Sequence, residues 1–216
     1  MRSFIKKILG QPLEINALAE NSTKIKVYSS ITDNVDPIRT DVQLFSDYDR
    51  FKEPRLNAKI YKILPHLFFD TGWSIWVDGN VLLHKSPEEY VNMVKKSGFE
   101  IGVFRHPRRN CIYVEAELCG RRNLDDPKII EAQMQRYRQG GYKENAGLAW
   151  CGLIIRKHTA NINRLNEKWW AEICTGSVRD QISFPYVFRD AVYYLPKQKR
   201  NFDSNKYFTC GKTHLK

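Results

Sequence analysis

With 216 residues, 42% of them hydrophobic, the chain can bury one substantial core, so we expect a single domain over residues 1–216, either complete or the N-terminal part of a longer protein. A formal net charge of +11 indicates an anionic partner, whether a nucleic acid, a membrane surface or a phosphate-bearing small molecule. The five cysteines form no Cys-x-x-Cys pair, which argues against a disulfide framework and a zinc site, and without a transmembrane run or signal peptide we expect a cytoplasmic protein.

Two strands and a helix are predicted in the first third of the chain. Residues 24–31 alternate in polarity and lead into a polar loop with Thr32 and Asp33, and residues 42–45 form a short second strand. The helix begins at Pro54 and carries an apolar stripe: Leu56, Ile60, Ile63 and Leu64. Its basic residues repeat that spacing one position earlier: Arg55, Lys59 and Lys62. Such a stripe is usually a solvated face, but one or two of these side chains could reach a crevice beside the next strand.

That next strand, residues 74–77, ends in the polar triplet Asp78, Gly79 and Asn80, and a second apolar run follows at residues 81–83. In open α/β sheets, ligands bind outside the carboxyl ends of the strands, so Asp78 is expected to project into such a crevice. Gly79 would let the backbone turn, and Asn80 would add a second oxygen. Two hard oxygen donors suit Mn²⁺ or Mg²⁺. The triplet also fits a hairpin turn between two strands, and both interpretations remain open.

The middle of the chain combines strong helix signals with a cluster of cations. Ser86, Pro87 and Glu89 start a helix that closes at Gly98, and residues 99–104 form a strand. Beyond this strand, residues 105–109 hold three arginines and His106, a density that favours contact with phosphate or carboxylate. Helices are expected over residues 112–119 and from residue 127 to 139. Because residues 105–145 are the most polar part of the chain, they are expected to form a mobile flap over the site.

The last third contains a nearly continuous apolar run, residues 148–156, which predicts a central strand. Thr159 caps the following helix, Asp180 and Gln181 begin another, and residues 192–195 form a last strand. This alternation predicts an α/β protein of Rossmann-like type. The chain lacks a Gly-x-Gly-x-x-Gly motif, a Walker loop and a Gly-x-Ser-x-Gly elbow, so something other than a glycine loop must hold the anion.

Several of these segments resemble glycosyltransferases with the GT-A fold. Their Arg-Leu, Leu-Pro, Tyr-Leu-Asp-x-Asp and Asp-Gln motifs correspond to residues 55–56, 64–65, 76–80 and 180–181. Over most of the chain, the sequence is similar to a glycosyltransferase-like family that includes plant cell-wall and mucilage proteins, and to the N-terminal domain of the capsid-glycosylating enzymes of chlorella viruses. The segments that carry this similarity are residues 76–80, 104–107, 152–158 and 179–187.

The resemblance implies a GT-A nucleotide-diphospho-sugar transferase fold, with a mixed central sheet flanked by helices and a UDP-sugar held through Mn²⁺ or Mg²⁺. Asn80 stands where the family has a second aspartate, and His214 is a possible third metal ligand or a solvated histidine of the tail. The residues implied in nucleotide-sugar binding are Thr32, Asp33, Arg55, Lys59, Asp78, Gly79, Asn80 and His106.

The same resemblance implies that Asp180 and Gln181 are catalytic. Asp180 would lie beside the anomeric carbon, where it either orients the sugar hydroxyls or deprotonates the acceptor. Its other interpretation is a helix-cap carboxylate or a partner of the neighbouring Arg179.

The expected function is therefore a metal-dependent glycosyltransferase that moves a hexose or deoxyhexose, of the glucose or rhamnose type, from a UDP-sugar to a glycan or glycoprotein. A viral capsid glycan, made in the host cytoplasm, is one such acceptor. The alternatives are a non-catalytic nucleotide-sugar or anion-binding module and a metal-dependent nuclease. The sequence has no second clustered acidic pair, and its aromatics are not interleaved with the basic runs, so no nucleic-acid partner is expected.

Overall fold

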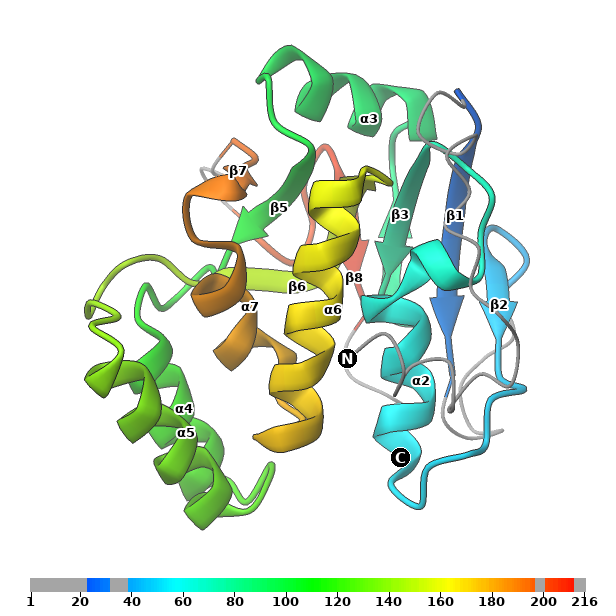
Figure 1. Ribbon diagram of the computed structural model, residues 1–216. Coiled ribbons are helices and arrows are strands. Elements are labelled where there is room, and N and C mark those ends of the chain that lie inside the picture. Colours follow the sequence, from blue (N-terminus) through cyan, green and yellow to red (C-terminus); the bar gives the residue numbers. More distant parts are fainter. Residues whose placement is uncertain (1–22, 32–38, 197–200, 212–216) are drawn as a thin grey trace.

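The computed structural model describes residues 23–31, 39–196 and 201–211. Its centre is a six-stranded sheet in the order β2-β1-β3-β6-β5-β7 (Figure 1). These strands are β1 (Ile25–Ser30), β2 (Gln43–Phe45), β3 (Trp73–Val77), β5 (Ile101–Arg105), β6 (Ala149–Lys157) and β7 (Tyr193–Tyr194). Strand β1 runs parallel to β2 and β3, whereas β6 is antiparallel to both β3 and β5. The prediction of a mixed α/β sheet is therefore confirmed.

Helices cover the sheet on both faces. They are α2 (Pro54–Ile63), α3 (Pro87–Lys96), α4 (Ile112–Arg121), α5 (Pro127–Gln139), α6 (Ala160–Thr175) and α7 (Asp180–Phe188), with short 3-10 turns at Pro65–Leu67 and Arg189–Ala191. Helices α2, α6 and α7 pack on one face, in a core that includes Trp76 and Ile154. Helix α3 packs on the other face, where Ile75, Val77 and Ile155 are buried. Both faces of β3 are therefore buried, which explains its continuous apolar sequence.

The helix starts lie where the capping signals predicted them. Glu53 caps α2 through the N–H of Arg55, with proline at the first helical position. Ser86 and Glu89 form a reciprocal capping box at the start of α3. In none of the described segments is there a helix that is both long and apolar enough to cross a membrane.

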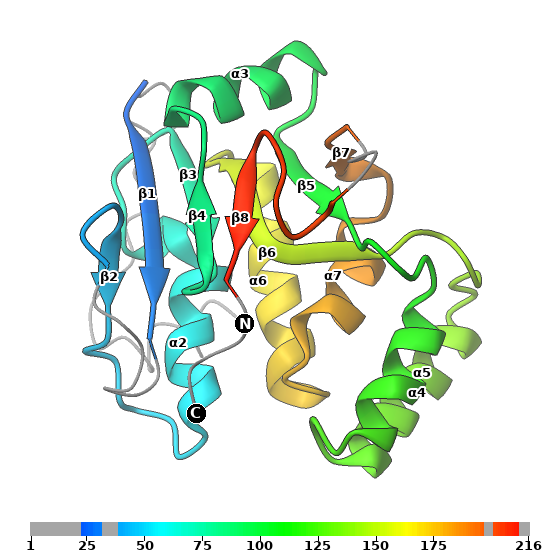
Figure 2. The ribbon, with the colours of Figure 1, turned by 180° about the vertical axis from the view of Figure 1, so that it is seen from behind.

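The second apolar run, β4 (Val81–Leu83), does not fold back on β3. It pairs antiparallel with β8 (Phe208–Cys210), a strand that the sequence did not predict, and this two-stranded sheet lies over the main sheet on the α3 side (Figure 2). The hairpin interpretation of the polar triplet is therefore wrong. Asp78 ends a strand of the main sheet, and the chain crosses to a separate sheet after it.

The predicted flap over residues 105–145 consists largely of two packed helices. Helices α4 and α5 form a hairpin at one edge of the molecule, next to α7 (Figure 1). Ile112, Ile130, Met134 and Tyr137 are buried between them, and Ile182 of α7 joins this core. The polar composition reflects the outer faces of these helices, while their inner faces supply the apolar contacts that hold the hairpin in place.

Candidate functional site

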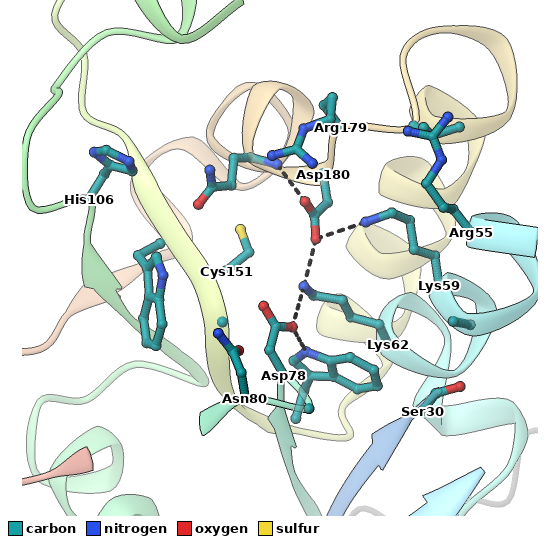
Figure 3. Close-up of a pocket in the computed structure, with 17 residues that line it drawn as sticks. Ser30, Arg55, Lys59, Lys62, Asp78, Asn80, His106, Cys151, Arg179 and Asp180 are labelled. Atoms are coloured by element: carbon teal, nitrogen blue, oxygen red, sulfur yellow. Dashed lines mark hydrogen bonds and ion pairs between the residues drawn. The ribbon is translucent and has the colours of Figure 1, made fainter. Parts of the chain in front are cut away.

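An open cleft of about 440 Å³ lies at the carboxyl ends of β1 and β3 (Figure 3). Because β6 is antiparallel to β3, its amino-terminal residues Trp150, Cys151 and Gly152 reach the same edge of the sheet. The start of α7 closes the cleft from the side opposite β3. The polar and charged residues that line it are Ser30, Arg55, Lys59, Lys62, Asp78, Asn80, His106, Arg179, Asp180 and Gln181.

Asp78 is held at the end of β3 by its own backbone and projects into this cleft. Its N–H donates to the carbonyl of Gly152 at 2.8 Å, and its carbonyl accepts from the N–H of Val81 at 2.9 Å, which closes the turn. The carboxylate accepts from the indole N–H of Trp76 at 2.7 Å and from the ammonium of Lys62 at 3.0 Å. With 39% of its side chain exposed, Asp78 can still reach a ligand.

Lys62 joins the two carboxylates of the cleft. Its Nζ lies 2.6 Å from Oδ2 of Asp180 as well as 3.0 Å from Oδ1 of Asp78 (Figure 3). Lys59, one turn earlier on α2, adds a second ion pair to Asp180 at 3.3 Å. Both lysine side chains are largely buried, so this part of the basic stripe faces the cleft and is not a solvated face.

These contacts determine the charges in the cleft. Burial alone would raise the pKa of Asp180, but Lys59, Lys62 and Arg179 together hold it well below its usual range. Burial lowers the pKa of Lys62, and Asp180 and Asp78 more than reverse this effect and raise it. Burial lowers the pKa of Lys59 in spite of its contact with Asp180. Asp180 is therefore an anion neutralised by its neighbours, and a weak base.

Asp180 and Gln181 form the first turn of α7, as predicted. Oδ1 of Asp180 accepts the backbone N–H of Gln181 at 3.1 Å, so the side chain also has a local role at the helix start. Its ion pairs are with the two lysines of α2 and not with the adjacent Arg179. The side-chain amide of Gln181 donates to Oε1 of Glu115 on α4 at 3.3 Å.

His106 follows β5 and lies across the cleft from α2 (Figure 3). Its Nδ1 accepts the backbone N–H groups of Arg108 and Arg109 at 3.2 and 3.0 Å. Burial, helped by Arg109, lowers its pKa to about 4, so the ring is neutral at pH 7. Two of the arginines expected near phosphate have other partners, since Arg109 pairs with Glu115 and Arg105 stacks on the ring of Tyr194 at 4.0 Å.

The other predicted donor-binding residues occupy the rim or lie beyond the described residues. Arg55 lines the cleft, but its guanidinium donates to Glu53 at 2.7 Å and to the carbonyl of Leu124 at 2.8 Å. Gly79 also lines the cleft, and a Cβ added there would meet nothing within 4 Å, so the turn itself does not require glycine. Three further predicted residues lie outside the described part of the chain: Thr32, Asp33 and His214.

The donor set at the cleft fits a divalent ion that is shared with a bound phosphate. Within residues 23–31, 39–196 and 201–211, no group of three or more His, Cys, Asp or Glu side chains could hold a metal by itself. Asp78 and Asn80 both line the cleft, and the amide nitrogen of Asn80 donates to the carbonyl of Gly211 at 3.3 Å. Mg²⁺ commonly binds one or two carboxylates together with substrate phosphates, so the small donor set is compatible with such an ion.

Sequence reasoning missed several residues that the fold brings to the cleft. Lys62 was identified only as a member of the basic stripe, and its position one turn beyond Lys59 was the available signal. The indole of Trp76 gave no signal, because its hydrogen bond to Asp78 depends on a side-chain rotamer. The sequence shows Glu115, just outside the cleft, as a carboxylate on the predicted helix over residues 112–119, but its contact with Gln181 arises from packing between distant segments.

The chain is similar to a protein family, to a plant protein and to a solved structure. A family model described as TOD1/MUCI70, glycosyltransferase-like domain, matches residues 42–215. The probable hexosyltransferase MUCI70 of Arabidopsis thaliana is 26% identical over 176 residues, a match that covers 73% of this chain and 30% of the relative. The chain thus spans about 30% of the length of that relative. The crystal structure of A197 from STIV aligns with a TM-score of 0.42 and 8% identity, over 90% of this chain and 97% of that one.

Proposed function

Because the chain belongs to the TOD1/MUCI70 glycosyltransferase-like family, we propose that it transfers a sugar from a nucleoside-diphosphate donor bound in the cleft. The observation that carries this proposal is the ion-pair group formed by Asp78, Lys62, Lys59 and Asp180 in an open cleft at the carboxyl edge of the sheet. It presents cations for a diphosphate beside carboxylates for a sugar.

The cations of this group account for stabilisation of the leaving group. As the glycosidic bond breaks, negative charge accumulates on the departing nucleoside diphosphate, and charges already fixed in a cleft stabilise it without reorganisation. Lys59, Lys62 and Arg179 are the side chains in position to do so. Asp78 and Asn80 would hold a Mn²⁺ or Mg²⁺ ion, which when bound supplies further positive charge against the diphosphate.

Asp180 is proposed to orient the donor sugar. A general base works best with a pKa near the working pH, whereas the lysines hold the pKa of Asp180 well below its ordinary value. A permanent carboxylate can instead accept hydrogen bonds from sugar hydroxyls. This property favours the orienting role over deprotonation of the acceptor.

The finer identity of the reaction is proposed from the resemblance of residues 55–56, 64–65, 76–80 and 180–181 to glycosyltransferase motifs. We propose a GT-A type enzyme that uses a UDP-sugar, with a hexose or deoxyhexose of the glucose or rhamnose type as the transferred group. The similarity to a probable hexosyltransferase of Arabidopsis supports a hexose. The proposed acceptor is a glycan or glycoprotein, such as the glycan of a viral capsid.

A ligand screen followed by turnover assays tests the proposal. UDP-sugars, GDP-sugars and single-stranded DNA are each added with and without Mn²⁺, and the melting temperature is measured, since selective binding stabilises the folded state. We expect stabilisation by a UDP-sugar with Mn²⁺, followed by release of UDP. Binding without release of UDP would indicate a non-catalytic module, and cleavage of the DNA would indicate a nuclease; either result contradicts the proposal.

A further inference from the structure

We infer that Glu115, a carboxylate of α4 outside the cleft, is a positioning residue that sets which end of the Gln181 amide faces the donor sugar. The inference rests on the proposed function, because it assigns a contact to the sugar in the same cleft. Glu115, on the α4–α5 hairpin, would thereby determine whether the protein offers a hydrogen-bond acceptor or a donor to the sugar beside Asp180.

Glu115 is buried and each of its oxygens has its own partner. Only 3% of the surface of Glu115 is exposed. Oε2 accepts a short hydrogen bond from Nε of Arg109, and Oε1 accepts from the amide nitrogen of Gln181 at 3.3 Å. The thiol of Cys119, one turn along the same helix, lies 3.8 Å from Oε1. A buried carboxylate is costly unless its oxygens are satisfied, so these contacts define its position.

The contact with Glu115 determines the orientation of the Gln181 amide. A carboxylate paired with a guanidinium can only accept hydrogen bonds, so the NH₂ end of Gln181 must face Glu115. The opposite orientation would bring two oxygens together. Gln181 also lines the cleft, next to Asp180, so its carbonyl oxygen is left to accept a hydrogen bond from a ligand. Sugar hydroxyls are donors of this kind.

The Glu115→Gln variant should reverse this polarity. Arg109 donates only, so it will hold the oxygen of the new amide and turn the NH₂ group toward Gln181. Gln181 must then rotate its own amide and present a donor to the cleft. We expect kcat to fall by up to about tenfold, the loss typical of one hydrogen bond between neutral groups. The Kd of UDP should be unchanged, because UDP lacks the transferred sugar that Gln181 is proposed to contact.

The reciprocal swap keeps the test independent of a simple folding defect. Gln181→Glu alone should also be impaired, because two carboxylates would face each other. In the double variant Glu115→Gln/Gln181→Glu, the amide at 115 donates to one oxygen of the carboxylate at 181, and the other oxygen again faces the cleft as an acceptor. We expect the double variant to recover activity relative to both single variants.

Glu117→Gln is the matched control, because Glu117 lies two residues away on the same helix and 67% of its side chain is exposed. This variant should behave like the wild type.

Two results would overturn the inference without affecting the proposed glycosyltransferase function. One is a wild-type kcat in Glu115→Gln, and the other is a double variant that is no more active than either single variant. Absence of turnover in the wild type with every nucleotide sugar would instead refute the proposed function, and the sugar contact with it.

Discussion

At the scale of single residues, Lys62 explains how two carboxylates can occupy one cleft. It lies 3.0 Å from Asp78 and 2.6 Å from Asp180, so each carboxylate has a cation at hydrogen-bond distance. Asp180 also forms an ion pair with a second cation, Lys59. Asp78 is the more exposed of the two carboxylates. The two acidic residues should therefore respond differently to substitution.

Asp78→Ala should abolish Mn²⁺-dependent donor binding and lower turnover by about a hundredfold or more, because it removes the proposed anchor of the ion. Donor binding with and without Mn²⁺ is measured by calorimetry, and the fold is checked by circular dichroism. Asp70→Ala is the control, since Asp70 is an exposed residue shortly before β3. Turnover of Asp78→Ala that Mn²⁺ still stimulates would exclude this metal assignment.

Asp180→Asn should retain more activity than Asp180→Ala. Asparagine keeps an oxygen that can accept from a sugar hydroxyl, whereas alanine keeps none. If Asp180 orients the sugar, kcat of the Asn variant should fall by less than about a hundredfold; loss of a catalytic base would cost that or more. Steady-state transfer and donor hydrolysis separate these cases. If both variants keep the wild-type rates of transfer and donor hydrolysis, Asp180 has only a structural role.

At the scale of elements, the packing of β6 against the β4–β8 sheet depends on one glycine, Gly152. A Cβ at Gly152 would lie 2.4 Å from an atom of the Trp150 indole, which belongs to the same face of the strand. The indole in turn stacks on Phe208 of β8 with ring centroids 4.8 Å apart. The glycine therefore leaves the space that lets the main sheet and the β4–β8 sheet pack together.

Gly152→Ala should destabilise the protein by about 1 to 3 kcal/mol, the usual cost of adding a methyl group to a packed site. Gly79→Ala is the matched control, because a Cβ there meets no atom within 4 Å, and its free energy of unfolding should be close to that of the wild type. Urea unfolding measures both. A Gly152→Ala variant as stable as Gly79→Ala would show that the indole moves without cost.

At the scale of the whole molecule, three partly or fully buried histidines among the described residues link stability to pH. Burial lowers the pKa of His66 below its usual value. Burial and Arg109 lower the pKa of His106 to about 4, and burial and Arg156 lower that of His158 to about 3. The unfolded chain binds these protons near pH 6.5, so it holds more protons than the folded protein between that pH and the lowered values. Stability should therefore fall as the pH drops from about 6.5 toward 4.

Replacing His106 with glutamine should remove part of this pH dependence, since glutamine does not titrate. The free energy of unfolding is measured between pH 7 and pH 4 in both proteins. The variant should lose less stability on acidification than the wild type, although His66 and His158 continue to contribute. Equal slopes would mean that His106 has the same proton affinity in the folded and unfolded chains.

Most of the elements and both cleft carboxylates could be predicted from the sequence alone. Helix starts followed from Pro54, Ser86 and Pro127, because capping and proline geometry are local. Asp78 stood out as a polar residue at the end of an apolar strand, and Asp180 stood out through the Asp-Gln dipeptide that resembles a glycosyltransferase motif. These properties depend on neighbouring residues only, so no knowledge of the fold was needed to find them.

Which of these residues lie together depends on tertiary packing. Strand β8 has three residues, too few for a periodic pattern, and exists because β4 pairs with it. Lys62 became the link between Asp78 and Asp180 because α2 and α7 meet at the edge of β3. Glu115 reaches Gln181 across 66 positions of sequence. Such contacts arise from packing between distant segments, and residue spacing along the chain carries no record of them.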